Sequence, residues 1–472
     1  MEVIGELEGI VGAAHVLTGA DMAPFSRDWL GKLTWQPQAV VRPASTGEVS
    51  RVMRVLARAG LPVVPVGGNT GLAGGTLAEG AVMLSLARMR RVREIRPQAR
   101  VAVVEAGVVL SDLHEAVAEH GLSFPMTFGA RGSCMIGGML STNAGGSNVL
   151  RYGNTRALCL GLEVVLADGR VLDLMSALHK DNTGYDLKDL FIGAEGTLGV
   201  ITGAVLKLVP APRAYATAMV ALPALAPALD LLNRLQEATG GAVEAFEYMP
   251  AAYFERLAEI HPEMRPPFAP HPVNILVELG ATAPRDATPR ADGSVPVVSY
   301  LEEVLAGLME GGAIEEAVVA RSEAERARMW AAREAAAEVM ISYAQRVDTD
   351  IALPLDGVAA FLTRMEAILP ELDPGASHTE VAHLGDGNIH YSVVMSREDA
   401  ALREAITERV EDEVRALGGT FSAEHGIGVS KLGSMRRRKD PVALDVMRAV
   451  KTALDPEGRM NPGKVLPEAA AT

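Results

Sequence analysis

The sequence predicts an α+β protein of more than one domain, and three observations support this. The chain has 472 residues, enough for two or three domains of roughly 150 residues each. Between about residues 40 and 210, short β-branched runs alternate with amphipathic helical patterns, and glycine or asparagine marks the joins. After Pro210 and Pro212 the sequence changes to Ala- and Leu-rich helical stretches, so we expect a domain boundary near residue 213.

The elements of the first half follow from their end signals. PASTGEVSRVMRVLARAG is expected to form a helix, because Ser45 or Thr46 can cap its start and Gly60 can end it. The runs LPVVPV, VAVVEAG, LGLEVVLADGRVL and LGVITGAVLKLVP are expected to be strands.

The second half is expected to begin with a helix from about Ala224 to Leu235. A longer helix is expected from Ser322 to Ala344, and strands around His378–His383 and Ile389–Met395. Two further helical stretches and a turn-rich end follow, between about residues 403 and 467.

The composition excludes several classes of protein. The net charge is −15, and no basic run is long enough to bind a phosphate backbone, so nucleic acid is not an expected partner. Cys134 and Cys159 are too few for a disulfide framework and suit a reducing compartment. No window reaches the roughly 18 apolar residues of a membrane span, and no secretory signal pattern is present. We therefore expect a cytoplasmic protein, or at most one peripheral to a membrane.

Three glycine-rich stretches indicate a nucleotide-like ligand. PVGGNTGLAGG follows a probable strand, where glycines free the backbone to turn N–H groups toward an anion. It lacks the GxGxxG and Walker A patterns. GSCMIGGMLSTNAGGSNVLRYG and DNTGYDLKDLFIGAEGTLGVIT add small residues at a density that suits a flat polar ring against the backbone. One such loop would be a tight turn, but three favour a bound nucleotide.

These three motifs resemble the FAD-binding domain of the vanillyl-alcohol oxidase superfamily, also called the p-cresol methylhydroxylase fold. The resemblance implies a domain of two subdomains with the FAD pyrophosphate on the loop Gly67–Gly71. Members with covalent flavin often carry a histidine in that loop, whereas Asn69 and Thr70 stand here, so non-covalent FAD is expected. The implied cofactor-binding residues are Pro65, Gly67, Gly68, Asn69, Thr70, Gly71, Leu72, Gly132, Ser133, Gly137, Gly138, Thr142, Asn143, Gly145, Gly146, Tyr152, Gly153, Glu195, Gly199, Ile201 and Asn461.

A cluster of histidines and carboxylates indicates a metal site. In EVAHLGDGNIHYSVVM, His383 and His390 flank LGDGN, whose Asp-Gly pair favours a hairpin turn, so the two imidazoles could face each other across paired strands. EHGIG adds Glu424 and His425 about thirty-five residues later. Two histidines and a carboxylate form a three-ligand set that leaves a position open for substrate.

HLGDGNIH and EHGIG resemble the C-terminal portion of the D-lactate, glycolate and D-2-hydroxyglutarate dehydrogenase group of the same superfamily. In that group the residues matching His383, His390 and Glu424 bind a divalent metal, commonly zinc, and the residue matching His425 is the catalytic base. Arg333 matches the arginine that binds the substrate carboxylate, for which a planar guanidinium is well suited. The resemblance covers about residues 35 to 467.

The implied organisation has four parts. These are an N-terminal helical segment (1–34), an FAD-binding domain (35–213), an α+β substrate or cap domain with an antiparallel sheet (214–420), and a C-terminal helical segment that returns to the flavin site (421–472).

Two departures from the group favour a monocarboxylic substrate. Hydroxyglutarate dehydrogenases have a threonine one turn after the arginine and a lysine shortly before a strand that ends in Leu-Pro, where this chain has Ala337 and Asp348. Asp348 would repel a second substrate carboxylate. We therefore expect D-lactate or glycolate, with D-2-hydroxyglutarate as the alternative and Arg321, Arg326 and Arg346 as substitute cations.

The sequence thus predicts an FAD-dependent dehydrogenase that oxidises a D-2-hydroxy acid by hydride transfer to flavin N5, with the metal orienting the substrate. His425 would accept the hydroxyl proton, because an imidazole titrates near neutral pH. The expected partners are the small 2-hydroxy acid, an electron acceptor (quinone, cytochrome or electron-transfer flavoprotein) and a second copy in a homodimer. Two alternatives stay open: a flavin-binding subunit of a multi-subunit glycolate oxidase, and a metal-dependent hydrolase with a nucleotide substrate.

Overall fold

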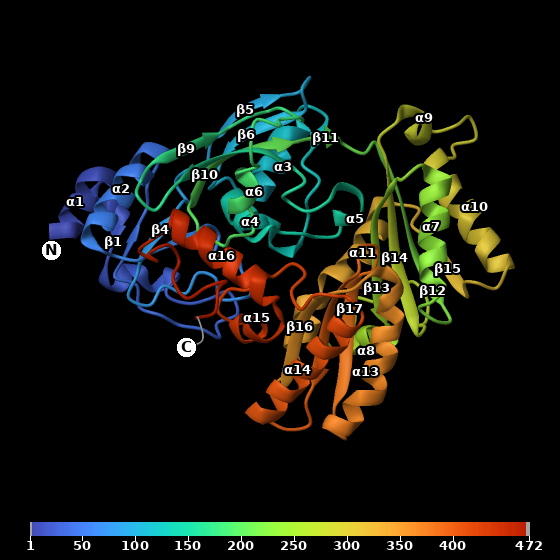
Figure 1. Cartoon of the computed structure of the whole chain (residues 1–472). Coiled ribbons are helices and arrows are strands. Elements are labelled where there is room, and N and C mark those ends of the chain that lie inside the picture. Colours follow the sequence, from blue (N-terminus) through green and yellow to red (C-terminus); the bar gives the residue numbers. More distant parts are fainter. Residues whose placement is uncertain (1, 469–472) are drawn as a thin grey trace. The chain divides into compact units, whose positions relative to one another are not determined.

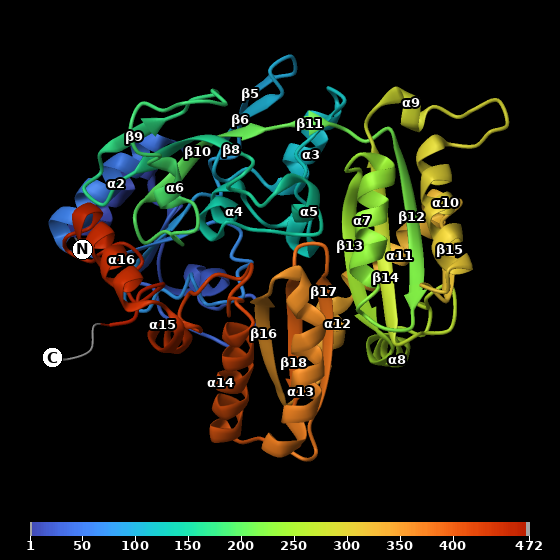
Figure 2. The same ribbon diagram turned by 45° about the vertical axis from the view of Figure 1, so that its right-hand side comes forward.

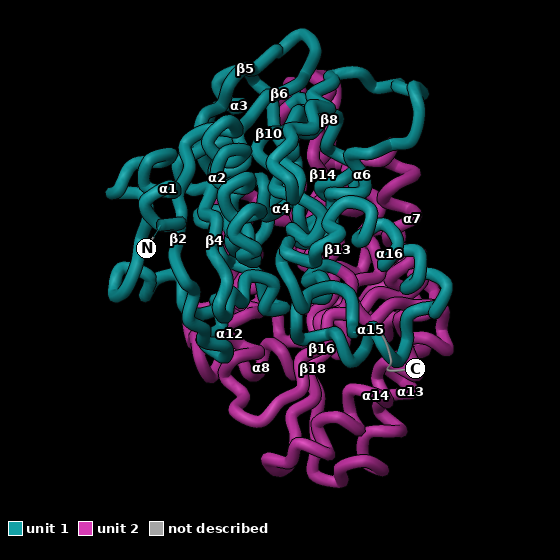
Figure 3. Tube along the Cα trace, turned by 60° about the vertical axis from the view of Figure 1, so that its left-hand side comes forward, with its two compact units in different colours: residues 1–145, 153–210, 424–472 teal, residues 146–152, 211–423 magenta. Residues whose placement is uncertain are grey.

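The computed structural model describes residues 2–468, and the chain divides into two compact units (Figure 3). Unit 1 comprises Met1–Gly145, Gly153–Pro210 and Glu424–Thr472, and unit 2 comprises Gly146–Tyr152 and Ala211–Ala423. Each unit combines helices with sheets that are mainly antiparallel, which confirms the predicted α+β class.

Unit 1 is built on a four-stranded and a five-stranded sheet (Figure 1). In the order β1-β2-β4-β3, the last three strands run parallel, and β1 is antiparallel to β2. The five-stranded sheet, in the order β5-β6-β10-β8-β9, is antiparallel throughout, and β7 pairs with β11. The strands are β1 (Val16–Leu17), β2 (Ala39–Val41), β3 (Val63–Val66), β4 (Val82–Ser85), β5 (Val92–Arg96), β6 (Val101–Glu105), β7 (Leu122–Ser123), β8 (Cys159–Val165), β9 (Val171–Leu174), β10 (Val200–Lys207) and β11 (Val209–Pro210).

The helices of unit 1 include one whose two end signals were predicted. Helix α2 begins after Ser45, whose side chain accepts a hydrogen bond from Glu48 N, and it ends at Gly60, which has a φ of 67°. The helices of unit 1 are α1 (Glu2–Val11), α2 (Thr46–Ala59), α3 (Leu110–Ala118), α4 (Ile136–Thr142), α6 (Lys188–Phe191), α15 (Leu432–Arg438) and α16 (Pro441–Leu454), with short 3₁₀ turns at Ala13–His15, Gly19–Phe25 and Gly129–Gly132.

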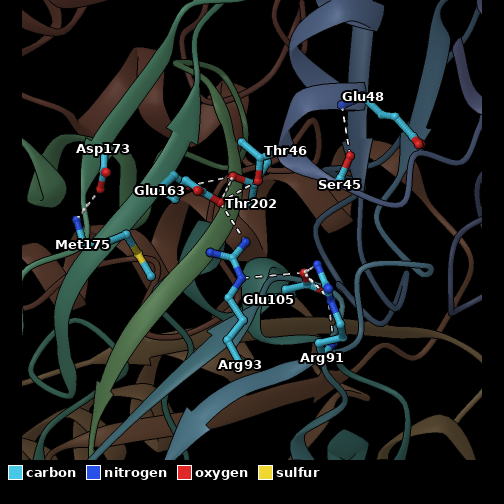
Figure 4. Close-up of polar contacts among 10 residues, drawn as sticks. All are labelled: Ser45, Thr46, Glu48, Arg91, Arg93, Glu105, Glu163, Asp173, Met175 and Thr202. Carbon is cyan, nitrogen blue, oxygen red and sulfur yellow. Dashed lines mark hydrogen bonds and ion pairs between the residues drawn. The ribbon is translucent and has the colours of Figure 1, made fainter.

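A polar network joins helix α2 to the five-stranded sheet (Figure 4). The Glu163 carboxylate on β8 accepts hydrogen bonds from Thr46 Oγ1 (2.5 Å), Arg93 Nη2 (2.9 Å) and Thr202 Oγ1 (3.0 Å). Arg93 also lies 3.6 Å from Glu105, a buried carboxylate on β6. Side-chain hydrogen bonds therefore tie elements that are distant in the sequence.

Residues 459–461, which follow α16, lie along the edge of the four-stranded sheet. Met460 forms a parallel bridge with Val63 of β3. Val63 N donates to Arg459 O, and Asn461 N donates to Val63 O. The segment after α16 therefore lies beside the strand that leads into the first glycine-rich loop.

Unit 2 is built on one antiparallel sheet in the order β15-β12-β14-β13-β17-β18-β16 (Figure 2). Its strands are β12 (Ala214–Leu222), β13 (Val243–Pro250), β14 (Val273–Ala281), β15 (Glu316–Val319), β16 (Arg346–Ala352), β17 (Ser377–His383) and β18 (Asn388–Val394). Its helices are α5 (Val149–Tyr152), α7 (Ala228–Thr239), α8 (Ala251–Ile260), α9 (Pro284–Ala287), α10 (Pro296–Glu310), α11 (Glu323–Glu334), α12 (Ala336–Ile341), α13 (Val358–Leu372) and α14 (Ala400–Ala416), with a 3₁₀ turn at Leu355–Gly357.

Two apolar cores cover the two faces of this sheet. Alternate strand residues such as Val220 and Val277 pack with helices α7, α10, α13 and α14. The intervening residues, such as Met219 and Leu276, pack with α8, α11 and α12. Because side chains alternate along a strand, polar residues that interrupt the second pattern lie on the face that α11 covers.

The helix expected from Ser322 to Ala344 is instead two helices. Ser322 caps the first, α11, as its side chain accepts from Glu325 N. The break follows Glu334, and α12 ends at Ile341. The hydroxyl of Tyr253 donates to Ala332 O at 2.6 Å, and a side chain that takes a carbonyl from the helical ladder bends or breaks a helix.

Both cysteines are buried and unpaired, and burial raises the pKa of Cys134 to about 11 and that of Cys159 to about 12. Within residues 2–468, no helix is both long enough and apolar enough to cross a membrane.

Candidate active site

The predicted cofactor loops of unit 1 are packed backbone against backbone. A Cβ added to Gly68 would lie 2.1 Å from Ser133 O, so only glycine allows the first and second glycine-rich stretches to approach this closely. Gly71, Gly132 and Gly138 have no described atom within 4 Å of the same position. Bare backbone at these three glycines suits a flat ligand, so the loops fit FAD.

Four predicted cofactor residues have a positive φ angle, a backbone conformation that is rare for residues other than glycine. Asn69, Asn143, Glu195 and Asn461 have φ angles of 53°, 52°, 51° and 41°. Among the described residues only Arg100 and Val465 share this trait. Such backbone strain concentrates at ligand-binding sites. This clustering supports the predicted site from the backbone alone.

Their side chains hold the loops together. Glu195 accepts hydrogen bonds from Ile427 N (2.7 Å) and Gly428 N (2.8 Å), and Asn461 Nδ2 donates to Glu195 O (2.6 Å) and Gly75 O (2.9 Å). Burial raises the pKa of the Glu195 carboxyl, while the two amides oppose the shift. The C-terminal segment is therefore fastened to the third glycine-rich stretch.

Four further cofactor candidates lie in or at the end of regular elements. Pro65 lies in β3 beside Gly196, and Thr142 Oγ1 donates to Gly138 O (3.2 Å) at the end of α4. Ile201 is buried in the five-stranded sheet. Tyr152 belongs to unit 2, and its hydroxyl donates to Glu244 at 2.7 Å.

In unit 2, the paired strands around the predicted metal ligands are confirmed. His383 ends β17 and His390 lies in β18, with Val381 opposite His390 in the antiparallel register. The two rings are 5.5 Å apart between centroids and nearly perpendicular, and a ring nitrogen of each lies within 4.8 Å of the other. The turn between them uses Gly387, with a φ of 84°.

A buried carboxylate that the sequence reasoning missed holds one of these histidines. Glu247 on β13 lies opposite His383 on β17 and is 1% exposed. Its Oε1 lies 2.8 Å from His383 Nδ1, and its Oε2 accepts from Arg333 Nε at 2.8 Å. Burial raises the pKa of Glu247, but the charges of His383 and Arg333 outweigh burial and hold the pKa below its ordinary value. The available signal for this carboxylate was that glutamates interrupt the otherwise apolar run VEAFEYM.

A second missed carboxylate, Asp350 on β16, stands beside the other histidine. Asp350 is 2% exposed and pairs in register with His390. Its Oδ1 lies 3.7 Å from His390 Nδ1 and accepts from Asn388 Nδ2 at 3.0 Å. At 3.7 Å the contact between Asp350 and His390 is not a hydrogen bond, whereas Glu247 makes with His383 the carboxylate–histidine hydrogen bond that orients ligating histidines in metal sites.

Glu424 and His425 follow a short segment, residues 422–423, that pairs with β16. Ser422 bridges to Asp350, and Ala423 N donates to Asp350 O at 3.2 Å. Because adjacent Cα atoms are about 3.8 Å apart, Glu424 comes one such step after Ala423, the residue that is hydrogen-bonded to Asp350. The ring nitrogens of His383 and His390, both in unit 2, are donors of the kind that a zinc-type ion binds.

Arg333 lies at the C-terminal end of α11 with one nitrogen unpaired. The residue is 7% exposed, and its Nε is bound to Glu247. Its Nη2 is buried and has no hydrogen-bond partner among the described residues. A buried guanidinium nitrogen without a partner is costly, so this atom suits an anionic oxygen of a substrate.

The charge of Asp348, which carried the expectation of a monocarboxylic substrate, is paired. Arg346 Nε donates to both oxygens of Asp348 at 2.9 Å, and Ser392 Oγ donates to Oδ1 at 2.9 Å. Ala337 is exposed on α12. Arg326, another suggested substitute cation, is bound to Glu278 through two nitrogens. Asp348 therefore adds little net negative charge, which weakens the argument against a dicarboxylate.

Two family models match this chain. The FAD binding domain matches residues 37–175, and the C-terminal domain of FAD linked oxidases matches residues 211–465. The mitochondrial D-2-hydroxyglutarate dehydrogenase of Bos taurus is 36% identical over 466 residues, which cover 98% of this chain and 83% of the relative. The D-2-hydroxyglutarate dehydrogenase of Xanthomonas citri pv. viticola is 34% identical over 454 residues, covering 94% and 93%.

Solved structures share the fold at low identity. p-Cresol methylhydroxylase with substrate bound has a TM-score of 0.73 at 16% identity, covering 98% of this chain and 96% of that one. The 4-ethylphenol oxidase from Gulosibacter chungangensis has a TM-score of 0.70 at 19% identity, covering 99% and 97%. The predicted p-cresol methylhydroxylase fold is confirmed.

Proposed function

The chain belongs to the FAD-linked 2-hydroxy-acid dehydrogenases, and from that premise we propose that its substrate is D-2-hydroxyglutarate. The observation that carries the proposal is the set of relatives, which match nearly the whole chain and bear that name. They favour the dicarboxylic alternative over the D-lactate or glycolate that the sequence led us to expect. The pairing of Asp348 with Arg346 removes the main objection to a dicarboxylate.

We assign the substrate's first carboxylate to Arg333. Its buried Nη2 can donate to a carboxylate oxygen, while Glu247 fixes the guanidinium through Nε. Arg346 is the cation that we assign to the second carboxylate, because it lies on the same strand as Asp350, and alternate residues share one face of a sheet.

The proton and metal roles fall to residues of two segments. We propose that His425 accepts the hydroxyl proton and that His383, His390 and Glu424 hold a divalent metal, with zinc as the first candidate. The Glu247 carboxylate at Nδ1 of His383 would fix the tautomer that offers Nε2 of that ring. Bound FAD supplies the hydride acceptor, and we infer non-covalent attachment through the glycine-rich loops of unit 1.

The test is the flavin spectrum of the purified protein under anaerobic conditions, with D-2-hydroxyglutarate, D-lactate and glycolate added separately. We expect D-2-hydroxyglutarate to bleach the flavin at the lowest concentration. Preferential bleaching by D-lactate or glycolate would restore the monocarboxylic alternative. Bleaching by none of the three would leave a flavoprotein without this activity, as in the alternative of a subunit that turns over only within a larger oxidase.

The electron acceptor is a separate question. We propose a quinone, a cytochrome or an electron-transfer flavoprotein, and reoxidation of the reduced enzyme by each class would identify it. Reoxidation by air at the same rate would contradict the assignment as a dehydrogenase.

A further inference from the structure

We propose that Glu247 is a positioning residue that holds Arg333 and His383 in one arrangement, so that carboxylate binding and metal binding depend on each other. The inference rests on the proposed function, because it takes Arg333 as the carboxylate ligand and His383 as a metal ligand.

One carboxylate makes both contacts. Oε1 of Glu247 lies 2.8 Å from His383 Nδ1, and Oε2 accepts from Arg333 Nε at 2.8 Å. As whole residues, Glu247, Arg333 and His383 are 1%, 7% and 9% exposed. They come from strand β13, helix α11 and strand β17, so a shift of Glu247 moves atoms of both partners.

The contact to His383 decides which ring nitrogen can bind a metal. An ionised carboxylate only accepts hydrogen bonds, so Nδ1 must carry the proton. The neutral ring then keeps its lone pair at Nε2, the nitrogen that a metal would use. Without the carboxylate, both tautomers and several ring orientations become accessible, and metal affinity falls.

The contact to Arg333 fixes the plane of the guanidinium. Binding through Nε does not use the terminal nitrogens, and of these Nη2 is the buried atom without a described partner. The arginine is thus prepared for a second anion. If Glu247 were replaced, the guanidinium could turn and the substrate carboxylate would have to order it on binding.

A neighbouring pair provides a matched control. Glu278 on β14 is 4% exposed and binds Arg326 on α11, two helical turns before Arg333, at 2.6 and 2.7 Å. Glu278 also accepts from Trp330 Nε1 (2.8 Å) and Thr217 Oγ1 (2.7 Å). The helix and the sheet face are the same, although Arg326 is more exposed than Arg333, and no histidine contacts this carboxylate in the described contacts.

The experiment compares Glu247→Gln with Glu278→Gln in the full-length flavoprotein after metal removal. Zinc affinity is measured by competition with a chromophoric chelator, and KM is measured for the acid that bleaches the flavin. For Glu247→Gln we expect zinc affinity to fall about 10- to 100-fold. We expect KM for the acid to rise in the same variant. For Glu278→Gln we expect a lower melting temperature, with zinc affinity and KM within about twofold of the wild type.

Glu247→Asp keeps the charge but is shorter by one methylene, so it cannot hold both partners at their present distances. We expect its zinc affinity to lie between those of the wild type and Glu247→Gln, and this variant replaces Glu247→Gln if the latter does not fold. A folded Glu247→Gln, or Glu247→Asp in its place, with wild-type zinc affinity would overturn the inference. A wild type that neither binds zinc nor is bleached by any 2-hydroxy acid would instead refute the proposed function.

Discussion

Two carboxylates, the partly buried Glu163 in unit 1 and the buried Glu247 in unit 2, show how a similar network can serve two purposes. Glu163 in unit 1 accepts three hydrogen bonds, all from residues that tie α2 to the sheet (Figure 4). Glu247 in unit 2 has two partners, and one of them, Arg333, ends in a buried nitrogen without a described acceptor. The first network is complete within the protein, while the second stops at a group that suits a ligand. The difference indicates which buried charges stabilise the fold and which are held for binding.

Metal removal should have the largest effect that distinguishes the Glu247 network from the Glu163 network. We expect dialysis against a strong chelator to abolish oxidation of the hydroxy acid and added Zn²⁺ to restore it, because Glu247 holds His383, one of the proposed metal ligands. The flavin spectrum should persist, since its loops lie in unit 1. Full turnover at a metal content shown by atomic absorption to be negligible would contradict a metal role.

Replacing Arg333, the residue of the Glu247 network whose Nη2 has no described partner, should have the next largest effect. Arg333→Gln removes the proposed carboxylate ligand, and losing one partner of a buried charge pair costs roughly 2–5 kcal/mol, or about 30-fold or more in kcat/KM. Steady-state kinetics check this. The matched variant Arg326→Gln should lower the melting temperature and leave kcat/KM within a few fold, and equal kinetic losses in both would erase the distinction between the two pairs.

The partly exposed pair of Arg346 and Asp348, at the edge of the same sheet, should affect selectivity more modestly. Asp348→Asn releases Arg346, so KM for D-2-hydroxyglutarate should fall by up to about fivefold, as expected for a partly exposed ion pair. KM for D-lactate, which has one carboxylate, should stay unchanged. A parallel change for both acids would show that Arg346 does not recognise the second carboxylate.

A change in the Glu163 network of unit 1 should alter the stability of the protein and not its activity. Glu163→Gln should cost about 1–3 kcal/mol of unfolding free energy at pH 7 and leave turnover unchanged. Burial raises the pKa of Glu163, but hydrogen bonds from Arg93, Thr46 and Thr202 lower it below its ordinary value of 4.5.

The direction of that shift sets the pH dependence. The stabilisation from ionised Glu163 is present above pH 4.5 and is lost as pH falls through the lower pKa of the folded protein. Denaturant melts of wild type and variant should therefore converge in acid. A constant difference down to pH 3 would show that the lost contact is not the ionised one.

Much of the fold could be predicted because its signals are local. Ser45 and Gly60 mark both ends of α2, and the glycine-rich stretches indicate loops that approach a ligand. The split between α11 and α12 could not be predicted, because its cause, Tyr253, is remote in the sequence.

The site was predicted through its short motifs and missed where partners come from other strands. His383 and His390 are separated by a single turn, whereas Glu247 is 136 residues from His383 in the chain. Asp348 weighs less against a dicarboxylate than we expected, for a reason that is visible in the sequence: Arg346 is two residues away and shares its face of β16.

The bridge between Val63 and Met460 has a consequence for how the protein is made. A ribosome adds about 5–20 residues per second, so β3 emerges roughly 20–80 s before the segment that completes its edge. During synthesis, the parallel sheet of unit 1 must persist with that edge uncovered, and a nascent strand edge is prone to pair with other chains. Stalled or C-terminally truncated chains should therefore be the species that chaperones retain.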